Sequence, residues 1–181
     1  MHLVIDIGNT SAKIAVFSQG EMKNVVRSSN QSLEGLDELC QQYPIKKGIW
    51  ASVISMPEEI QRQLQQLPFP MTEFTYQTPI PIRNLYKTPQ TLGVDRLAAV
   101  IAAYTLKPHH PALVIDAGTC ITYDFIDEFG QYQGGNISPG MEMRFKALHE
   151  FTSKLPQIQA SGETPYYGNS TETAIRSGVI R

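Results

Sequence analysis

A short sequence pattern that occurs twice constrains the fold of this chain more than any other feature. The first copy is Val4-Ile5-Asp6-Ile7-Gly8-Asn9-Thr10, and the second is Val114-Ile115-Asp116-Ala117-Gly118-Thr119, which is one residue shorter. Each copy is typical of a buried strand that ends in an aspartate and is followed by a tight turn. Residues with alternating polarity follow both turns and predict a β-hairpin in each case. A unit repeated 110 positions apart predicts two similar domains that face each other across a nucleotide.

The residues of the first turn suit a phosphate group. Successive backbone N–H groups and the hydroxyls of Thr10 and Ser11 can point at one place, which favours an anion. Asp6 would lie beside that anion, so a cation is expected between the two negative charges. An ordinary Gly-Asn hairpin turn is the simpler interpretation of one copy alone, and the second copy is what favours a phosphate site.

Composition excludes several classes of protein. With 181 residues, 41% of them hydrophobic and 18% charged, the chain has the composition of one large or two small folded domains. A net charge of −2 and the lack of a Lys/Arg-rich run argue against nucleic-acid binding. No apolar segment has transmembrane length, and no signal-peptide pattern opens the sequence. We therefore expect a cytoplasmic protein that binds neither nucleic acid nor membrane.

Hydrophobic spacing predicts an α/β fold in both halves of the chain. The first half is expected to contain strands at 2–7, 12–17, 21–28 and 49–54, and helices at 33–40 and about 57–67. Prolines make 77–90 an extended segment, and an alanine-rich helix is predicted in the stretch 91–104 that follows. The second half is expected to contain the second hairpin, a strand-to-helix turn at 134–140, and helices at 141–148 and from 172 onward, the last capped by Ser170 or Thr171.

Several charged residues have plain structural interpretations. Asp95 can complement the dipole of the helix that it begins, and Arg96 can be its solvated neighbour. Asp124 and Asp127 follow the second turn and are expected to be solvated. The pair His109-His110 lacks a third ligand at a usual spacing, so a solvated linker is favoured over a metal site.

Four motifs, in this order and spacing, resemble those of the type III pantothenate kinases. They are residues 6–10, Gly93-Val94-Asp95-Arg96, residues 116–119, and 134–140, and residues 145–149 and 155–156 are also similar. The first and third alone are typical of the wider actin-like, sugar-kinase-like ATPase superfamily, and the Gly-x-Asp-Arg element at a helix start narrows the resemblance. It covers essentially the whole chain, but family members continue for several tens of residues past Arg181.

The resemblance implies an α/β fold of two similar actin-like (ribonuclease H-like) ATPase domains with mixed sheets flanked by helices. The domains are expected at 1–107 and 108–181, with the second one incomplete. The implied activity is ATP-dependent phosphorylation of pantothenate, the first committed step towards coenzyme A. It also implies a homodimer that requires Mg²⁺ and a monovalent cation, K⁺ or NH₄⁺.

The same resemblance implies roles for individual residues. ATP would be bound by the first turn and by Thr119, that is by Asp6, Ile7, Gly8, Asn9, Thr10, Ser11, Ala12, Lys13 and Thr119. Asp95 would be the general base for the pantothenate hydroxyl, and Asp116 would hold the monovalent cation. The pantothenate site would be lined by Tyr86, Gly93, Val94, Asp95, Arg96 and Thr171. These roles agree with the needs of phosphoryl transfer, which are positioning, charge neutralisation and a base near the acceptor hydroxyl.

Two other functions stay open at this point. Another kinase of the superfamily, acting on a sugar or on acetate, would share both phosphate turns, and only the acceptor site would distinguish it. A catalytically inactive nucleotide-binding protein, or an accessory factor for transcription, would share the turns without turnover.

Overall fold

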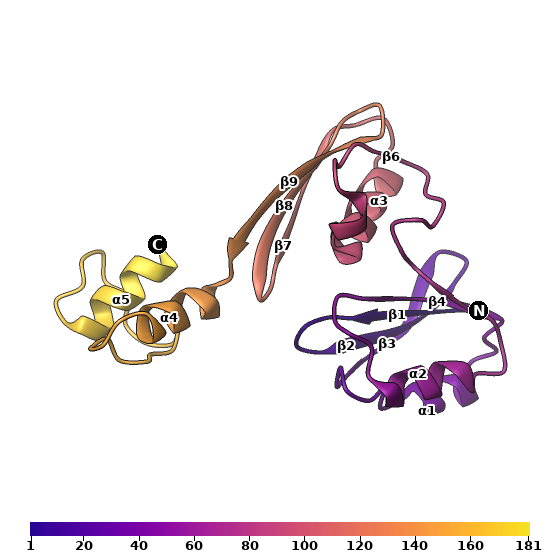
Figure 1. Cartoon of the computed structure of the whole chain (residues 1–181), viewed down its shortest axis with the longest axis horizontal. Coiled ribbons are helices and arrows are strands. Elements are labelled where there is room, and N and C mark those ends of the chain that lie inside the picture. Colours follow the sequence, from indigo (N-terminus) through magenta and orange to yellow (C-terminus); the bar gives the residue numbers. More distant parts are fainter.

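The opening hairpin forms the centre of the first of two β-sheets in the computed structural model, which describes residues 1–181 (Figure 1). The elements of this part are β1 His2–Ile7, β2 Ala12–Ser18, β3 Glu21–Ser28, α1 Leu36–Gln42, β4 Lys47–Ser52, α2 Glu58–Gln65 and β5 Met71–Glu73. The strand order is β3-β2-β1-β4-β5, with β2 antiparallel to β1 and β3, and β4 parallel to β1 and β5. This is the strand order of a ribonuclease H-like domain.

Alternation along β1 builds the first core. Leu3, Ile5 and Ile7 are buried on the face that α1 and α2 cover, where they pack with Leu36 and Ile60 among others. Intervening residues such as Asp6 are left on the opposite face. The sheet therefore holds its first turn, residues 8–11, at the end of a strand anchored on one side by apolar packing.

The second sheet contains the repeat of the hairpin. Its elements are β6 Arg83–Asn84, a 3₁₀ turn Pro89–Thr91, α3 Val94–Leu106, β7 Ala112–Ala117, β8 Cys120–Ile126 and β9 Gln131–Pro139, in the strand order β6-β9-β8-β7. Helix α3 covers one face, where Leu97 and Val100 pack with Ile126 and Tyr132. Residues 83–106 thus pair and pack with the second sheet, while the predicted division of the chain at residues 107 and 108 stays a prediction.

The other face of the second sheet is open. Leu113 and Ile115 of β7 are 60% and 57% exposed, and Phe125, the register partner of Leu113 on β8, is 41% exposed. Strand β7 is also the last strand of its sheet, whereas the equivalent strand β1 is paired with β4 on its outer side. The two copies of the hairpin therefore have different surroundings.

Two helices, α4 Met141–Glu150 and α5 Thr171–Ile180, form a C-terminal lobe beyond the end of β9 (Figure 1). They pack through Phe145, Ile175 and Val179. Ser170 caps α5 by accepting a hydrogen bond from the N–H of Thr173 at 3.2 Å. No helix of the chain combines the length and the apolar character needed to span a membrane.

The α/β fold with two mixed sheets flanked by helices is confirmed, and the predicted strands and helices are present with small shifts at their ends. One prediction was wrong, because residues 134–139 belong to strand β9 and not to a turn. The glycines there serve close approach instead: a Cβ on Gly135 would lie 1.9 Å from the carbonyl oxygen of Tyr123. Helix α1 begins at Leu36, after Gly35 adopts a left-handed conformation with φ of 85°, which delays the predicted start at 33.

Candidate functional site

The two Asp-x-Gly turns meet. The hydroxyl of Thr10, at the tip of the first hairpin, lies 3.2 Å from the hydroxyl of Thr119, at the tip of the second, although the residues are 109 positions apart in sequence. Both side chains are exposed. The turns that the repeat singled out are therefore brought to one place by the packing of the two sheets.

The first turn is held open by a side chain from outside it. Asn30 donates its side-chain N–H groups to the carbonyl oxygens of Gly8, at 3.1 Å, and Asn9, at 2.8 Å. The Gly8 N–H donates to the Ser11 carbonyl at 3.0 Å, whereas the N–H groups of Asn9, Thr10 and Ser11 donate to no other atom of the chain. Three successive free N–H groups beside fixed carbonyls form a concavity suited to a phosphate.

The second turn is held by the start of α4. The Gly140 N–H donates to the carbonyl oxygen of Thr119 at 3.0 Å. A Cβ on Gly140 would lie 2.3 Å from the Gly118 carbonyl oxygen and 2.4 Å from that of Thr119, so only glycine permits this contact. The Gly118 N–H donates to the Cys120 carbonyl at 2.8 Å, and the hairpin closes at that point.

Three aspartates line one cavity of about 480 Å³ between the first sheet and α3. Asp6 comes from the end of β1, Asp116 from β7, and Asp95 from the first turn of α3. The remaining lining is apolar and comes from β1, β4, Phe74 and α3. Asp6 accepts a hydrogen bond from the exposed Lys13 ammonium at 3.3 Å. Nowhere do three or more acidic, His or Cys side chains converge to hold a metal ion by themselves.

One oxygen of Asp95 is used by its own helix. Oδ1 accepts a hydrogen bond from the backbone N–H of Arg96 at 2.8 Å, and Oδ2 makes no hydrogen bond within the chain. A Cβ on Gly93 would lie 2.6 Å from Oδ1. Gly93 therefore provides the space in which the Asp95 carboxylate folds back on the helix start, and the second oxygen is left available to a ligand.

Arg96 is buried, which corrects its plain interpretation as a solvated neighbour of Asp95. Its side chain is 6% exposed, and Nε donates to both oxygens of Asp124, at 3.1 and 3.0 Å, while Nη2 donates to Oδ1 at 2.6 Å. The hydrogen bond to Asp124 raises the pKa of Arg96 above its ordinary value, although burial opposes this shift.

The prediction that Asp124 is solvated was wrong, since this residue is 1% exposed. Its Oδ1 also accepts a hydrogen bond from the buried Tyr132 hydroxyl at 2.6 Å, and burial together with this bond raises the pKa of Tyr132. Alternation along β8 could have revealed the position: Asp124 shares a face with Ile126, which packs beneath α3. A buried aspartate requires a buried partner, and the neighbouring helix supplies one. Asp127 accepts bonds from the N–H groups of Phe129 and Gln131 in the hairpin turn.

Tyr86 packs against the buried cluster formed by Arg96, Asp124 and Tyr132. Its ring stacks on that of Tyr132, with centroids 6.2 Å apart and planes 6° apart, and the Arg96 guanidinium carbon lies 5.8 Å from the Tyr86 centroid. Gly134 faces the Tyr86 ring, and a Cβ added to it would lie 3.5 Å from Cδ2 of that ring. The structure thus joins Tyr86 to Arg96, two of the residues expected at the acceptor.

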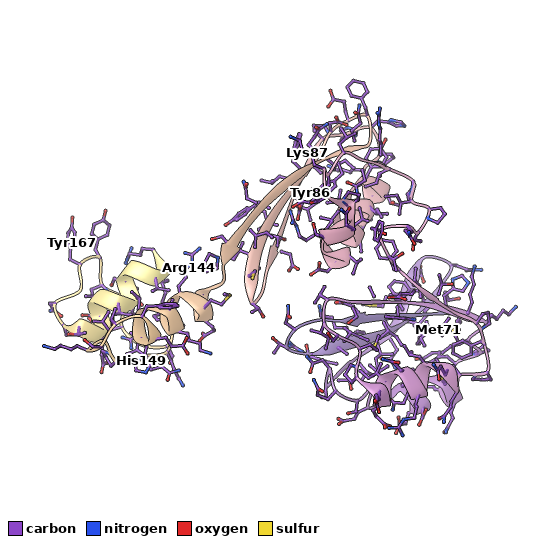
Figure 2. All side chains as sticks on the ribbon, viewed as in Figure 1. Met71, Tyr86, Lys87, Arg144, His149 and Tyr167 are labelled. Carbon is purple, nitrogen blue, oxygen red and sulfur yellow. The ribbon has the colours of Figure 1, made fainter.

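The other expected residues differ in how they can act. Ile7 and Ala12 are fully buried in the first core, so only their backbone can face a ligand. Val94 is half-buried at the start of α3. Thr171 begins α5 in the C-terminal lobe, which lies away from α3 in Figure 1; in Figure 2, Tyr86 lies beside α3 and Tyr167, just before α5, lies at the far end of the molecule. The chain does not bring Thr171 to Asp95.

A ribonuclease H-like sheet and a second mixed sheet that repeats its opening hairpin, with their Asp-x-Gly turns in contact, define an α/β protein of the actin-like ATPase class. Residues 2–181 match the family described as type III pantothenate kinase, and the chain belongs to that family. It is 64% identical over 181 residues to a type III pantothenate kinase of Phocaeicola vulgatus. This match covers 100% of this chain and 75% of the relative. It is 55% identical over 179 residues to a type III pantothenate kinase of Bacteroides fragilis, and this match covers 99% of this chain and 74% of that relative.

A solved structure of a conserved Baf family protein from Campylobacter jejuni is similar in fold. The match has a TM-score of 0.57 at 21% identity, and it covers 98% of this chain and 73% of the other. At this identity the similarity shows the fold alone. The chain spans about three quarters of the length of the proteins that it resembles.

Proposed function

We propose that this protein transfers the terminal phosphoryl group of ATP to the primary hydroxyl of pantothenate and forms 4′-phosphopantothenate, the first step towards coenzyme A. Family membership over residues 2–181 supports this activity. The observation that carries it in the structure is the contact of Thr10 with Thr119, because the two turns meet there and the aspartates that precede them, Asp6 and Asp116, line a cavity together with Asp95.

In this proposal the triphosphate is bound mainly by the first turn. The free N–H groups of Asn9, Thr10 and Ser11, the hydroxyls of Thr10 and Thr119, and the Lys13 ammonium supply donors from both sheets. Phosphoryl transfer depends on positioning and on neutralising phosphate charge, and these donors do both. Asp6, Ile7, Gly8 and Ala12 complete the same turn through their backbone and, for Asp6, its carboxylate.

The donor set also fits the cations that the family implies. Mg²⁺ is commonly held by one or two carboxylates together with substrate phosphates, and Asp6 offers such a carboxylate beside the phosphate turn. Asp116, on the equivalent strand of the second sheet, would hold K⁺ or NH₄⁺. These cations would neutralise the phosphate oxygens.

The acceptor is proposed to lie at the start of α3. Asp95 has an oxygen without a hydrogen bond that can take the proton of the pantothenate hydroxyl, and Gly93, Val94, Arg96 and Tyr86 would line the acceptor beside it. A role for Thr171 requires that α5 of a second copy reach this place, which agrees with a homodimeric enzyme. The proposed setting is the cytoplasm, where ATP and pantothenate are available.

An acceptor screen tests the proposal. ADP release is measured with ATP-Mg²⁺ in K⁺ buffer for pantothenate, for several sugars and for acetate, and the product is examined by mass spectrometry. Of the acceptors tested, we expect only pantothenate to be turned over, and its product should be heavier than pantothenate by one phosphoryl group. Turnover with a sugar or with acetate would favour another kinase, and nucleotide binding without turnover on any acceptor would favour an inactive nucleotide-binding protein.

A further inference from the structure

We propose that Asp124 and Tyr132 act as positioning residues that set the acceptor preference, by holding the Arg96 guanidinium so that its remaining edge recognises the carboxylate of the acceptor. This inference rests on the proposed function and deepens it. Neither residue is among those that the four motifs select, and both lie beneath α3 and not in the cavity lining.

The Asp124 carboxylate fixes one edge of the guanidinium. Nε and Nη2 both donate to it, and the Tyr132 hydroxyl donates to the same Oδ1 at 2.6 Å. An arginine held through two nitrogens cannot rotate about its last bonds without breaking charge-assisted hydrogen bonds. With Asp124 1% exposed and Tyr132 fully buried, water cannot replace these partners, so the orientation of Arg96 is set from below the helix.

The remaining edge of the guanidinium meets no second carboxylate. Nη1 of Arg96 donates to no carboxylate or carbonyl oxygen of the chain, and the Tyr86 hydroxyl is the further group whose hydrogen bonding raises the pKa of Arg96. The Tyr86 ring flanks the guanidinium, with its centroid 5.8 Å from Cζ of Arg96. The proposed general base, Asp95, is the residue immediately before Arg96 in helix α3. A planar N–H edge beside an aromatic ring is suited to a carboxylate.

The charges near the acceptor explain why such a group is needed. Asp6, Asp95 and Asp116 all line the cavity, so an anionic acceptor would be repelled there unless a cation is turned towards it. Pantothenate carries its carboxylate at the end opposite the reacting hydroxyl. An Arg96 released from Asp124 could turn to the nearby aspartates instead, and the preference for an acidic acceptor would then be lost.

The experiment compares pantothenate with its neutral analogue, in which the carboxylate is reduced to an alcohol. The kcat/KM ratio of acid to alcohol, and the KM for ATP, are measured for the wild type, Asp124→Asn and Tyr132→Phe. Asp127→Asn is the matched control, since it makes the same change in a carboxylate that binds only its own hairpin turn and Gln133. Tyr104→Phe is the control for Tyr132→Phe, because its hydroxyl has no hydrogen-bond partner.

We expect the wild type to prefer the acid at least tenfold. Asp124→Asn should reduce this ratio to near one, Tyr132→Phe should reduce it severalfold, and both should act through the KM for the acid while the KM for ATP is unchanged. If Asp124→Asn does not fold, Tyr132→Phe, which keeps the stacked ring, decides. Equal losses on both acceptors, an unchanged ratio, or a wild type without preference would overturn the inference alone. A wild type that phosphorylates neither acceptor would overturn the proposed function as well.

Discussion

Gly93 is required by space and not by backbone conformation. Its φ of −56° and ψ of 124° suit any residue, yet an added Cβ would lie 2.6 Å from Oδ1 of Asp95. Gly93→Ala should therefore move the Asp95 carboxylate away from the helix start. A displacement of about 1 Å at a reacting group can cost on the order of 10²-fold in rate, so a fall of that order in kcat is expected in the ADP-release assay.

The control for this change is Gly178→Ala in α5, where an added Cβ meets no atom within 4 Å. Alanine should stabilise that helix by roughly 0.5–1 kcal/mol and leave kcat unchanged. Thermal unfolding of both variants separates positioning from folding. If Gly93→Ala keeps full turnover, the close contact with Asp95 has no catalytic meaning.

Asp95→Asn tests the proposed base directly. The asparagine Oδ1 can still accept the Arg96 N–H, so the helix start and the unfolding temperature should be preserved. Turnover should fall by roughly 10²–10⁴-fold, the usual contribution of general acid–base catalysis. Affinity for ATP, measured by calorimetry, should be unaffected. Near-normal turnover would remove Asp95 from the mechanism.

Asp116→Ala tests the proposed monovalent-cation ligand. The wild type should depend on K⁺ or NH₄⁺ and lose most of its rate in Na⁺ alone, while the variant should be slow in all three. Because Asp116 is exposed on β7, its removal should leave stability nearly unchanged. Equal wild-type rates in K⁺ and Na⁺ buffers would contradict the assignment.

Among the loops and strands, Asn30 holds the first Asp-x-Gly turn through two hydrogen bonds, although no motif includes it. It follows β3 and binds two carbonyl oxygens of the turn through its side-chain amide. Asn30→Ala removes both bonds, each worth roughly 0.5–1.5 kcal/mol, and should raise the KM for ATP about tenfold. The KM for pantothenate should be unchanged, and Asn24→Ala, on the adjoining strand β3 without a side-chain bond to the turn, should leave both KM values as they are. Equal KM values for ATP in Asn30→Ala and the wild type would show that the turn holds its shape unaided.

The same residues show how far sequence reasoning extends. The repeat predicted both hairpins and both turns, because alternation and turn chemistry act within a few residues of each other. The roles of Asn30 and Asp124 were not predicted, since each depends on a partner 21 to 28 positions away across a sheet or helix. Residues 134–140 suggest a turn by sequence because their glycines suit a turn equally well when the crowding of Gly135 by Tyr123 and Asp124 is unknown.

For the molecule as a whole, the open face of the second sheet is the feature that bears on assembly. Leu113, Ile115 and Phe125 form a contiguous apolar area on β7 and β8, and β7 has a free edge. Such areas favour association. We expect the chain to self-associate through this face.

Leu113→Glu should weaken that association on the order of tenfold or more, because an unpaired carboxylate would be buried in the interface. Leu106→Glu is the control, since Leu106 is 83% exposed at the end of α3, away from this face. The mass in solution is measured against concentration for both variants. Identical dissociation of the two would place the interface elsewhere.

The contact between Thr10 and Thr119 also bears on the order in which the molecule folds. Each hairpin closes over a few residues and can form early, whereas the contact of the two tips joins residues 109 positions apart and depends on both sheets being complete. We therefore expect nucleotide affinity to be acquired in the last step of folding. A nucleotide at about 100 times its Kd would then add about 2.7 kcal/mol to the stability of the finished chain, in which both turns have met.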